Sequence, residues 1–177
     1  MKARQFQTVF SFVLASALGV ATMAVSEPPT AQAQNLSGTI RSVVAGKCIQ
    51  PVDSSTVEGA AIVQEPCDST AVPAQLWTII PWKGYFHYVN QATGMCLDAR
   101  GGAQNHTPVE QWPCNSISNE HWVYTPAKPG DQSVVVVYSA VAGSSGKFCL
   151  DVPGGQKTDG LALQIYTCNG TKSQQWF

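Results

Sequence analysis

The side chains with the most distinctive chemistry in this 177-residue sequence are six cysteines. They fall into three pairs, and the two members of each pair lie 18 or 19 residues apart. This spacing differs from the Cys-x-x-Cys motif of zinc and redox sites, and no two histidines have a helical metal-binding spacing, so we expect no metal and no cofactor. In an oxidising compartment six cysteines allow 15 disulfide pairings. The three pairs are Cys48 and Cys67, Cys96 and Cys114, and Cys149 and Cys168.

A carboxylate and an aromatic ring recur at fixed places around the second and third cysteine pairs. Asp98 and Asp151 each stand two residues after the first cysteine, and Trp112 and Tyr166 stand two residues before the second. An ionised carboxylate accepts hydrogen bonds from hydroxyl groups, and an aromatic face packs against C–H groups. The set therefore fits a ligand with vicinal hydroxyls at its edge and an apolar face.

Each cysteine pair is followed by a tryptophan, which indicates that the chain contains three copies of one unit. Short apolar runs in each unit alternate with Gly, Pro, Asn and Asp clusters, a pattern that predicts about four short strands per unit. Roughly twelve strands that close into a threefold barrel would leave no exposed edges. A propeller, the competing architecture, usually takes at least four blades, so we predict an all-β fold of the β-trefoil type. The three tryptophans are Trp77, Trp122 and Trp176.

Composition agrees with one β domain and argues against a polyanionic partner. Charged residues make up 12% of the chain and apolar residues 44%, with 15 Gly and 11 Pro. This mixture is too hydrophobic for a disordered chain and too rich in turn residues for a helical bundle. The formal net charge is -1, from 10 Lys and Arg against 11 Asp and Glu, so we expect no nucleic-acid partner.

The N-terminal segment has the features of a secretion signal. Lys2 and Arg4 precede an uncharged stretch, 6–25, which leads to the small-residue motif Ala31-Gln32-Ala33. We therefore expect a cleaved signal peptide over residues 1–33, no membrane span in the mature chain, and a secreted, extracellular protein. An uncleaved N-terminal anchor is the alternative, and Ala24 is a second candidate cleavage point. The domain would then cover residues 34–177, with repeats at about 37–81, 84–126 and 133–177.

The three units resemble those of ricin B-chain-type lectins, the family-13 carbohydrate-binding modules. The family's Gln-x-Trp signature is present as Gln75-Leu76-Trp77 and Gln174-Gln175-Trp176, and Glu120-His121-Trp122 departs from it at one residue. The family's Cys-Leu-Asp triplet is present as Cys96-Leu97-Asp98 and Cys149-Leu150-Asp151. The resemblance covers nearly all of the chain after residue 33. It implies a β-trefoil of three Cys-Cys-(Q/E)xW repeats, one disulfide inside each repeat, and up to three shallow sugar sites.

The resemblance also implies which side chains contact a sugar. The second repeat holds a full set of aspartate, aromatic ring and amide, whereas the third has serine in the amide position with a glutamine beside it. The first repeat keeps its cysteines and tryptophan but holds Gln50, Glu65 and Ala74 at the contact positions, so we expect it not to bind. The expected carbohydrate-binding residues are Asp98, Trp112, Asn119, Asp151, Tyr166, Ser173 and Gln174.

Several interpretations of these residues stay open. Trp112 could be a core residue, Asp98 could cap a turn, and Trp82 fits a hairpin position better than a fourth site. We expect a non-enzymatic protein, because hydrolysis needs two carboxylates about 5 to 9.5 Å apart and each predicted site holds one. The expected function is binding of galactose-type or xylan-type glycans, including plant polysaccharides. A hydrolase inhibitor or the docking subunit of a secreted toxin is the alternative, and the sequence does not predict an oligomeric state.

Overall fold

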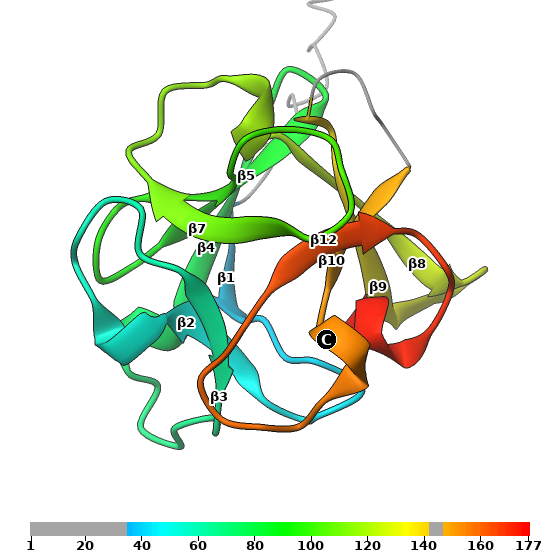
Figure 1. The fold of residues 1–177 in the computed structure, drawn as a ribbon, viewed down its shortest axis with the longest axis horizontal. Coiled ribbons are helices and arrows are strands. Elements are labelled where there is room, and N and C mark those ends of the chain that lie inside the picture. Colours follow the sequence, from blue (N-terminus) through cyan, green and yellow to red (C-terminus); the bar gives the residue numbers. More distant parts are fainter. Residues whose placement is uncertain (1–34, 142–146) are drawn as a thin grey trace, which may run out of the picture. The chain divides into compact units, whose positions relative to one another are not determined.

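The computed structural model describes residues 35–141 and 147–177 (Figure 1). Within these ranges the chain forms short strands joined by tight turns and single turns of 3-10 helix. The signal peptide expected over residues 1–33 lies outside the described residues. No helix in the described part of the chain is long and apolar enough to cross a membrane.

The strands follow one order that occurs three times, which confirms the all-β prediction. Each repeat contributes four strands, and a two-residue strand, β11, is added in the third. The strands of the first repeat are β1 (Leu36–Thr39), β2 (Cys48–Pro51), β3 (Ile62–Glu65) and β4 (Leu76–Trp82). Those of the second are β5 (Tyr85–Asn90), β6 (Cys96–Ala99), β7 (Thr107–Trp112) and β8 (Trp122–Lys128). Those of the third are β9 (Asp131–Ser139), β10 (Phe148–Asp151), β11 (Leu161–Ala162), β12 (Gln164–Thr167) and β13 (Gln175–Trp176).

Single turns of 3-10 helix occupy matching places in the repeats. One such turn stands just before or at the signature tryptophan motif of every repeat, and another follows the first hairpin strand in two of them. The turns before the tryptophans are η2 (Pro73–Gln75), η3 (Ser118–Glu120) and η6 (Lys172–Gln174). The turns after hairpin strands are η1 (Val52–Ser54) and η5 (Pro153–Gly155).

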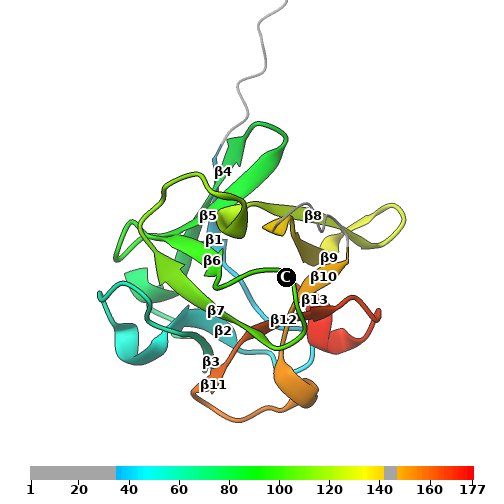
Figure 2. The ribbon, with the colours of Figure 1, turned by 45° about the horizontal axis from the view of Figure 1, so that its top comes forward.

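Six strands, two from each repeat, form a closed antiparallel barrel. β1 pairs with β4, β4 with β5, β5 with β8, β8 with β9, and β9 with β13 (Figures 1 and 2). The ring is closed by backbone hydrogen bonds in both directions between Arg41 and Phe177, at 3.2 and 2.8 Å. Closure leaves the barrel without a free strand edge, as the trefoil prediction required.

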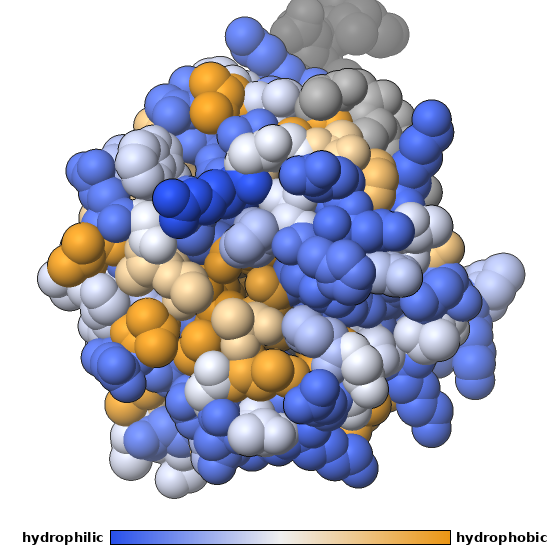
Figure 3. All heavy atoms as spheres, viewed as in Figure 1, coloured by the Kyte–Doolittle hydropathy of each residue, from blue (hydrophilic) through white to orange (hydrophobic). Residues whose placement is uncertain are grey.

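The remaining strands form one hairpin in each repeat, and the three hairpins meet over one end of the barrel. The hairpins are β2–β3, β6–β7 and β10–β12. Their contacts are also antiparallel: β7 pairs with β12, β11 pairs with β3, and Ala61 bridges to Glu110. Polar side chains cover most of the face shown in Figure 3, and apolar ones are visible near its middle. The hairpins carry the aspartates and aromatic residues predicted to contact a ligand, and the 3-10 turns η3 and η6 carry the other predicted contacts.

The core repeats with the same threefold pattern. Trp77, Trp122 and Trp176 are each 1% exposed or less. Each indole N–H donates to the carbonyl of the residue after the first cysteine of its repeat, at 3.1, 2.9 and 3.2 Å. Burial of the ring and satisfaction of its one donor explain why tryptophan is required there. The prediction that these three residues belong to the core is confirmed.

Each hairpin is closed by the disulfide that the family resemblance implies. Each bond ties the first strand of a hairpin to the loop after its second strand, near the start of the following 3-10 turn. The hairpin therefore keeps its register beside the pocket that it lines. The structure joins Cys48 to Cys67, Cys96 to Cys114 and Cys149 to Cys168.

Candidate functional site

The hairpin of the second repeat lines an open pocket of about 300 Å³. Asp98 on β6 lies opposite Glu110 on β7, and Trp112 follows Glu110 by two residues. Because side chains alternate along a strand, Glu110 and Trp112 project from the same face of the hairpin, and this face lines the pocket. Trp112 is 38% exposed, which places it on the surface and excludes the core interpretation. The pocket is lined by Asp98, Arg100, Gly101, Glu110, Trp112, Ile117 and Asn119.

Carboxylates dominate the electrostatics of this pocket. Asp98 is 3% exposed, and burial raises its pKa to about 7, with further contributions from Glu120 and Glu110. The guanidinium of Arg100 donates to Glu110 at 3.0 Å and forms an ion pair with it. The sequence-based expectation of one carboxylate per site is therefore wrong for the second repeat, where Glu110 lines the pocket together with Asp98. The motif spacing did not indicate Glu110, because its place in the pocket depends on the register of β7 against β6.

The hairpin of the third repeat lines a pocket of about 400 Å³ with a related arrangement. Asp151 on β10 lies opposite Gln164 on β12, and the Gln164 amide donates to its carboxylate at 2.7 Å. The Tyr166 ring is half-buried and meets the His106 ring edge-on, with centroids 5.0 Å apart. The pocket is lined by His106, Asp151, Gly154, Gln164, Tyr166, Asn169, Thr171 and Ser173.

Amide groups hold the aspartate of the third repeat. Burial raises the pKa of Asp151, while hydrogen bonds from Gln164 and Gln174 and the nearby His106 act to lower it. Gln174 is fully buried, and its oxygen accepts the backbone N–H of Asn169 at 2.8 Å. This differs from the expectation that Gln174 contacts a ligand: the side chain supports Asp151 from behind and is not among the residues that line the pocket.

The first repeat has a pocket of comparable size but of different chemistry. Its volume is about 460 Å³, and no aromatic side chain lines it. Gln50 takes the place of the aspartate, and its oxygen accepts a hydrogen bond from Gln75 at 2.8 Å. Glu65 lies opposite Cys48, where the other repeats have Trp112 and Tyr166. The structure thus brings the predicted aspartate and aromatic residues together in two repeats and not in the first.

Left-handed turns follow the site position in all three repeats. Gly101 and Gly102 have φ of 83° and 114° in the second repeat. In the first repeat Asp53 and Ser54 adopt φ of 51° and 53° without glycine. The glycine pairs therefore do not separate a binding repeat from a non-binding one, although glycine makes this conformation easier to adopt.

Some pocket residues could have been found from the sequence and others could not. Alternation along a strand places Glu110 beside Trp112 and Gln164 beside Tyr166, which the sequence indicates once the strands are assigned. His106 belongs to the second repeat but lines the pocket of the third, where its Nδ1 lies 3.0 Å from the Gln164 oxygen. No local sequence signal predicts that contact between repeats.

Two other groupings among the described residues have different explanations. His87, Cys96 and Glu120 bring possible metal ligands within 4.8 Å of one another, but the Cys96 sulfur is part of a disulfide. Trp82 is 37% exposed near the β4–β5 turn, stacked on His87 with centroids 5.6 Å apart. The Lys83 ammonium lies 5.2 Å from the Trp82 ring centroid. Neither grouping has the aspartate and aromatic pair of the two pockets.

Comparison with solved structures places this architecture among known trefoils. A designed threefold-symmetric protein, ThreeFoil, matches with a TM-score of 0.70 and 23% identity, over 79% of this chain and 95% of that one. The lectin of Macrolepiota procera in complex with lactose matches with a TM-score of 0.64 and 19% identity, over 80% and 92%. An exo-β-1,3-galactanase from Clostridium thermocellum matches with a TM-score of 0.67 and 26% identity, over 78% of this chain but 28% of the enzyme.

Comparison at the level of sequence identifies the family. No curated protein sequence matches this chain. The model of the ricin-type beta-trefoil lectin domain matches residues 36–176, from the first strand of the barrel to the last signature tryptophan. The resemblance drawn from the cysteine pairs and Gln-x-Trp motifs is thereby confirmed. The chain belongs to the ricin-type β-trefoil lectin family, whose lectin domain supports carbohydrate binding.

Proposed function

We propose that this protein is an exported lectin that binds galactose-type or xylan-type glycans through the pockets of the second and third repeats. One observation carries the proposal: a buried aspartate and a surface aromatic ring line the same pocket in these two repeats, and not in the first. The scaffold is the same in all three repeats, so the difference concerns the ligand and not the fold.

The geometry of the second pocket suits a sugar ring. Ionised Asp98 would accept hydrogen bonds from two vicinal hydroxyls, and Asn119 on the pocket wall would donate and accept. The exposed face of Trp112 would stack on the C–H groups of the ring. A shallow pocket with one aromatic platform should bind a single sugar weakly, with a Kd on the order of 1 mM, and two pockets on one polymer should bind about a hundredfold more tightly.

The choice of sugar class draws support from structural relatives. The Macrolepiota procera lectin was solved with lactose, and the matched Clostridium thermocellum enzyme is a galactanase. Galactose-type glycans are therefore the first ligands to test, and xylan is the second because of the resemblance to family-13 modules. A glycan array on the purified protein, followed by retardation on lactose and xylan gels, tests both classes.

Four variants locate the binding repeats. Asp98→Ala and Asp151→Ala should each weaken retardation, and the double variant should abolish it, because each removes the hydroxyl acceptor of one pocket. Glu65→Ala removes a carboxylate of the first repeat's pocket, at the position of Trp112 and Tyr166, and serves as the control; it should be retarded like the parent. Retardation that is lost with Glu65→Ala and kept in the double variant would contradict the proposal.

Binding without hydrolysis is part of the proposal. The pocket of the second repeat holds Asp98 and Glu110, but Glu110 is paired with Arg100 at 3.0 Å and so is poorly suited to act as a free base or nucleophile. Incubation with lactose and with xylan should release no new reducing ends. Release that disappears in Asp98→Ala would replace the lectin proposal with that of a glycoside hydrolase.

The alternative, an inhibitor or toxin docking subunit, makes different predictions. An inhibitor would have no need of the aspartate and aromatic pairs, so it would bind a hydrolase equally well after Asp98→Ala. Export is tested by N-terminal sequencing of the protein from the culture medium. The expected mature chain starts at residue 34, and an intact Met1 in the membrane fraction would support the anchor alternative.

A further inference from the structure

The signature glutamine has a defined structural role in the first and third repeats. In the first repeat, the Gln75 oxygen accepts the backbone N–H of Asp68 at 2.9 Å, and its amide nitrogen donates to the carbonyl of Pro66 at 2.9 Å. Gln174 makes the same two kinds of hydrogen bond in the third repeat, at 2.8 and 3.1 Å. The glutamine thus uses both its acceptor and its donor to hold the loop around the second cysteine.

The same amide also serves the site residue. Gln75 donates to the Gln50 oxygen at 2.8 Å, and a hydrogen bond from Gln174 favours the ionised form of Asp151. A carboxylate that faces an amide donor keeps its negative charge at lower pH. In the third repeat the signature glutamine therefore favours the ionised form of the aspartate, and in the first it holds the glutamine that stands in the aspartate's place.

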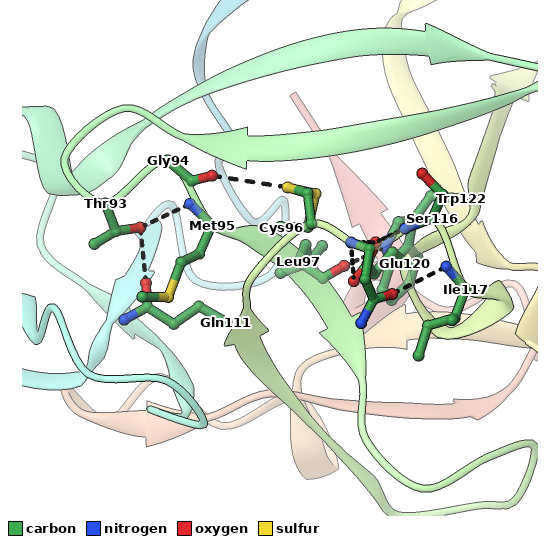
Figure 4. The surroundings of a disulfide bond; sticks show 12 residues. Thr93, Gly94, Met95, Cys96, Leu97, Gln111, Ser116, Ile117, Glu120 and Trp122 are labelled. Carbon is green, nitrogen blue, oxygen red and sulfur yellow. Dashed lines mark hydrogen bonds between the residues drawn. A yellow bond between two sulfur atoms is a disulfide. The ribbon is translucent and has the colours of Figure 1, made fainter.

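The second repeat has Glu120 at this position, with a different effect. Its oxygens accept the backbone N–H groups of Asn115 at 3.2 and 3.0 Å and of Ser116 at 2.9 Å (Figure 4). The acceptor role is therefore kept. An ionised glutamate has no N–H to offer, so the amide donor that faces Asp151 in the third repeat is replaced at Asp98 by a like charge. Glu120 is fully buried, and burial raises its own pKa.

The groups on the other sides of Asp98 do not replace the missing amide donor. Glu110 on β7 stands where the third repeat has Gln164, and its charge is engaged by Arg100. From β5, His87 approaches Glu120 within 4.8 Å, and burial together with His121 lowers the pKa of His87. His121 at the end of η3 favours ionised Glu120. From the first repeat, uncharged Gly59 lies beside Glu110 and Trp112.

We propose that Glu120 makes glycan binding by the second repeat pH-dependent: this pocket holds sugar at neutral to alkaline pH and releases it at mildly acidic pH, while the third pocket keeps binding. The inference rests on the proposed lectin function. Glu120 is a positioning residue, because it does not line the pocket and acts on the sugar through Asp98.

The physical cause is the loss of the charged acceptor. Asp98 has a pKa near 7, so its carboxylate takes up a proton as the pH falls through neutrality. A protonated carboxyl accepts hydroxyl hydrogen bonds less strongly than an ionised one and presents an O–H of its own. Burial raises the pKa of Asp151 as well, but hydrogen bonds from Gln164 and Gln174 act to lower it, so we expect Asp151 to keep its charge at lower pH than Asp98.

The experiment isolates the second pocket and changes only its signature residue. In an Asp151→Ala background, retardation on lactose and xylan gels is measured from pH 5 to pH 8.5, with and without Glu120→Gln. Retardation of the Asp151→Ala protein should fall several-fold as the pH is lowered, with a midpoint near pH 7. Glu120→Gln should shift this midpoint down by about one pH unit or more, since it replaces a like charge by a donor. This variant should fold, because two repeats already carry glutamine there.

The reciprocal change provides the matched control. In an Asp98→Ala background, Gln174→Glu should raise the midpoint of the third pocket by about one unit or more. The circular dichroism spectrum of each variant, recorded at each pH, distinguishes a change in binding from unfolding. Binding by the second pocket that is equal at pH 5 and pH 8.5, or an unchanged midpoint in Glu120→Gln, overturns this inference alone. Absence of retardation on both gels at pH 8.5 in the unmodified protein overturns the lectin proposal as well.

Discussion

The second and third repeats share a scaffold and differ in how they hold their aspartate. Both place a tryptophan in the core, a disulfide at the hairpin and an aspartate at the same strand position. Asp151 is flanked by the amides of Gln164 and Gln174, whereas Asp98 is flanked by the carboxylates of Glu110 and Glu120. The comparison shows that fold and ligand chemistry are set by different residues within one repeat.

The largest expected effect tests the shared part of the two repeats. Trp122→Ala and Trp176→Ala should each lower the free energy of unfolding by about 3 to 5 kcal/mol, because each leaves a cavity and an unpaired carbonyl in the core. Urea unfolding followed by fluorescence measures both. Similar losses are expected, and a small loss in one variant would show that the repeats do not share a common core.

Disulfide removal should have a somewhat smaller effect. Replacing both Cys96 and Cys114 by alanine opens a loop of 18 residues, and the chain-entropy model gives a cost of about 3 kcal/mol. The Cys149 and Cys168 pair closes a loop of 19 residues and should cost a similar amount. Peptide mapping without reduction should find both bonds within their repeats. A bond between repeats would contradict the structure.

Ligand affinity separates the two pockets. Asp98→Ala or Trp112→Ala should weaken sugar binding at the second pocket by about 1 to 3 kcal/mol, equivalent to about 5- to 150-fold in Kd. Asp151→Ala should weaken sugar binding less, because the third pocket has Ser173 where the second has Asn119 and therefore binds more weakly from the start. Calorimetry above pH 8, where Asp98 is ionised, gives both values. A larger loss from Asp151→Ala would reverse this ranking.

A smaller effect concerns stability and pH without any sugar. The folded-state pKa of Asp98, about 7, lies above the value near 3.8 expected for an unfolded chain. The folded protein therefore binds more protons than the unfolded one between these values, and stability falls as the pH rises from about 4 to 7. Asp98→Asn should flatten this slope. Thermal unfolding of both proteins across that range measures it, and parallel curves would contradict the assigned pKa.

Sequence patterns predicted the scaffold well because its residues recur at regular spacing. Trp77, Trp122 and Trp176 mark three units, and a threefold closed barrel follows from them. The predicted aspartates and aromatics also line two pockets in the structure. The motifs do not contain strand register or contacts between repeats. Glu110 lies opposite Asp98 across a strand pair, which follows only after the strands are assigned, and His106 of the second repeat lines the third pocket.

The role of the signature position also needed three-dimensional information. The sequence shows Glu120 as a one-residue departure from Gln-x-Trp, but it does not show which group the side chain faces. The structure places this position behind the site aspartate, where an amide donates in the other repeats. Similarly, two repeats have a glycine pair in the turn after the site aspartate, but Asp53 and Ser54 of the first repeat form the same kind of turn without glycine.

The most direct test of the account is to observe where a sugar contacts the folded protein. The uniformly ¹⁵N-labelled protein is titrated with lactose and with a xylan oligosaccharide at pH 8.5, and amide and indole N–H shifts are followed by NMR. We expect shifts at the Trp112 indole and Gly101 in the second pocket, at Gly154 and Thr171 in the third, and none around Ser54 in the first. Shifts confined to the first repeat, or none with either sugar, would contradict it.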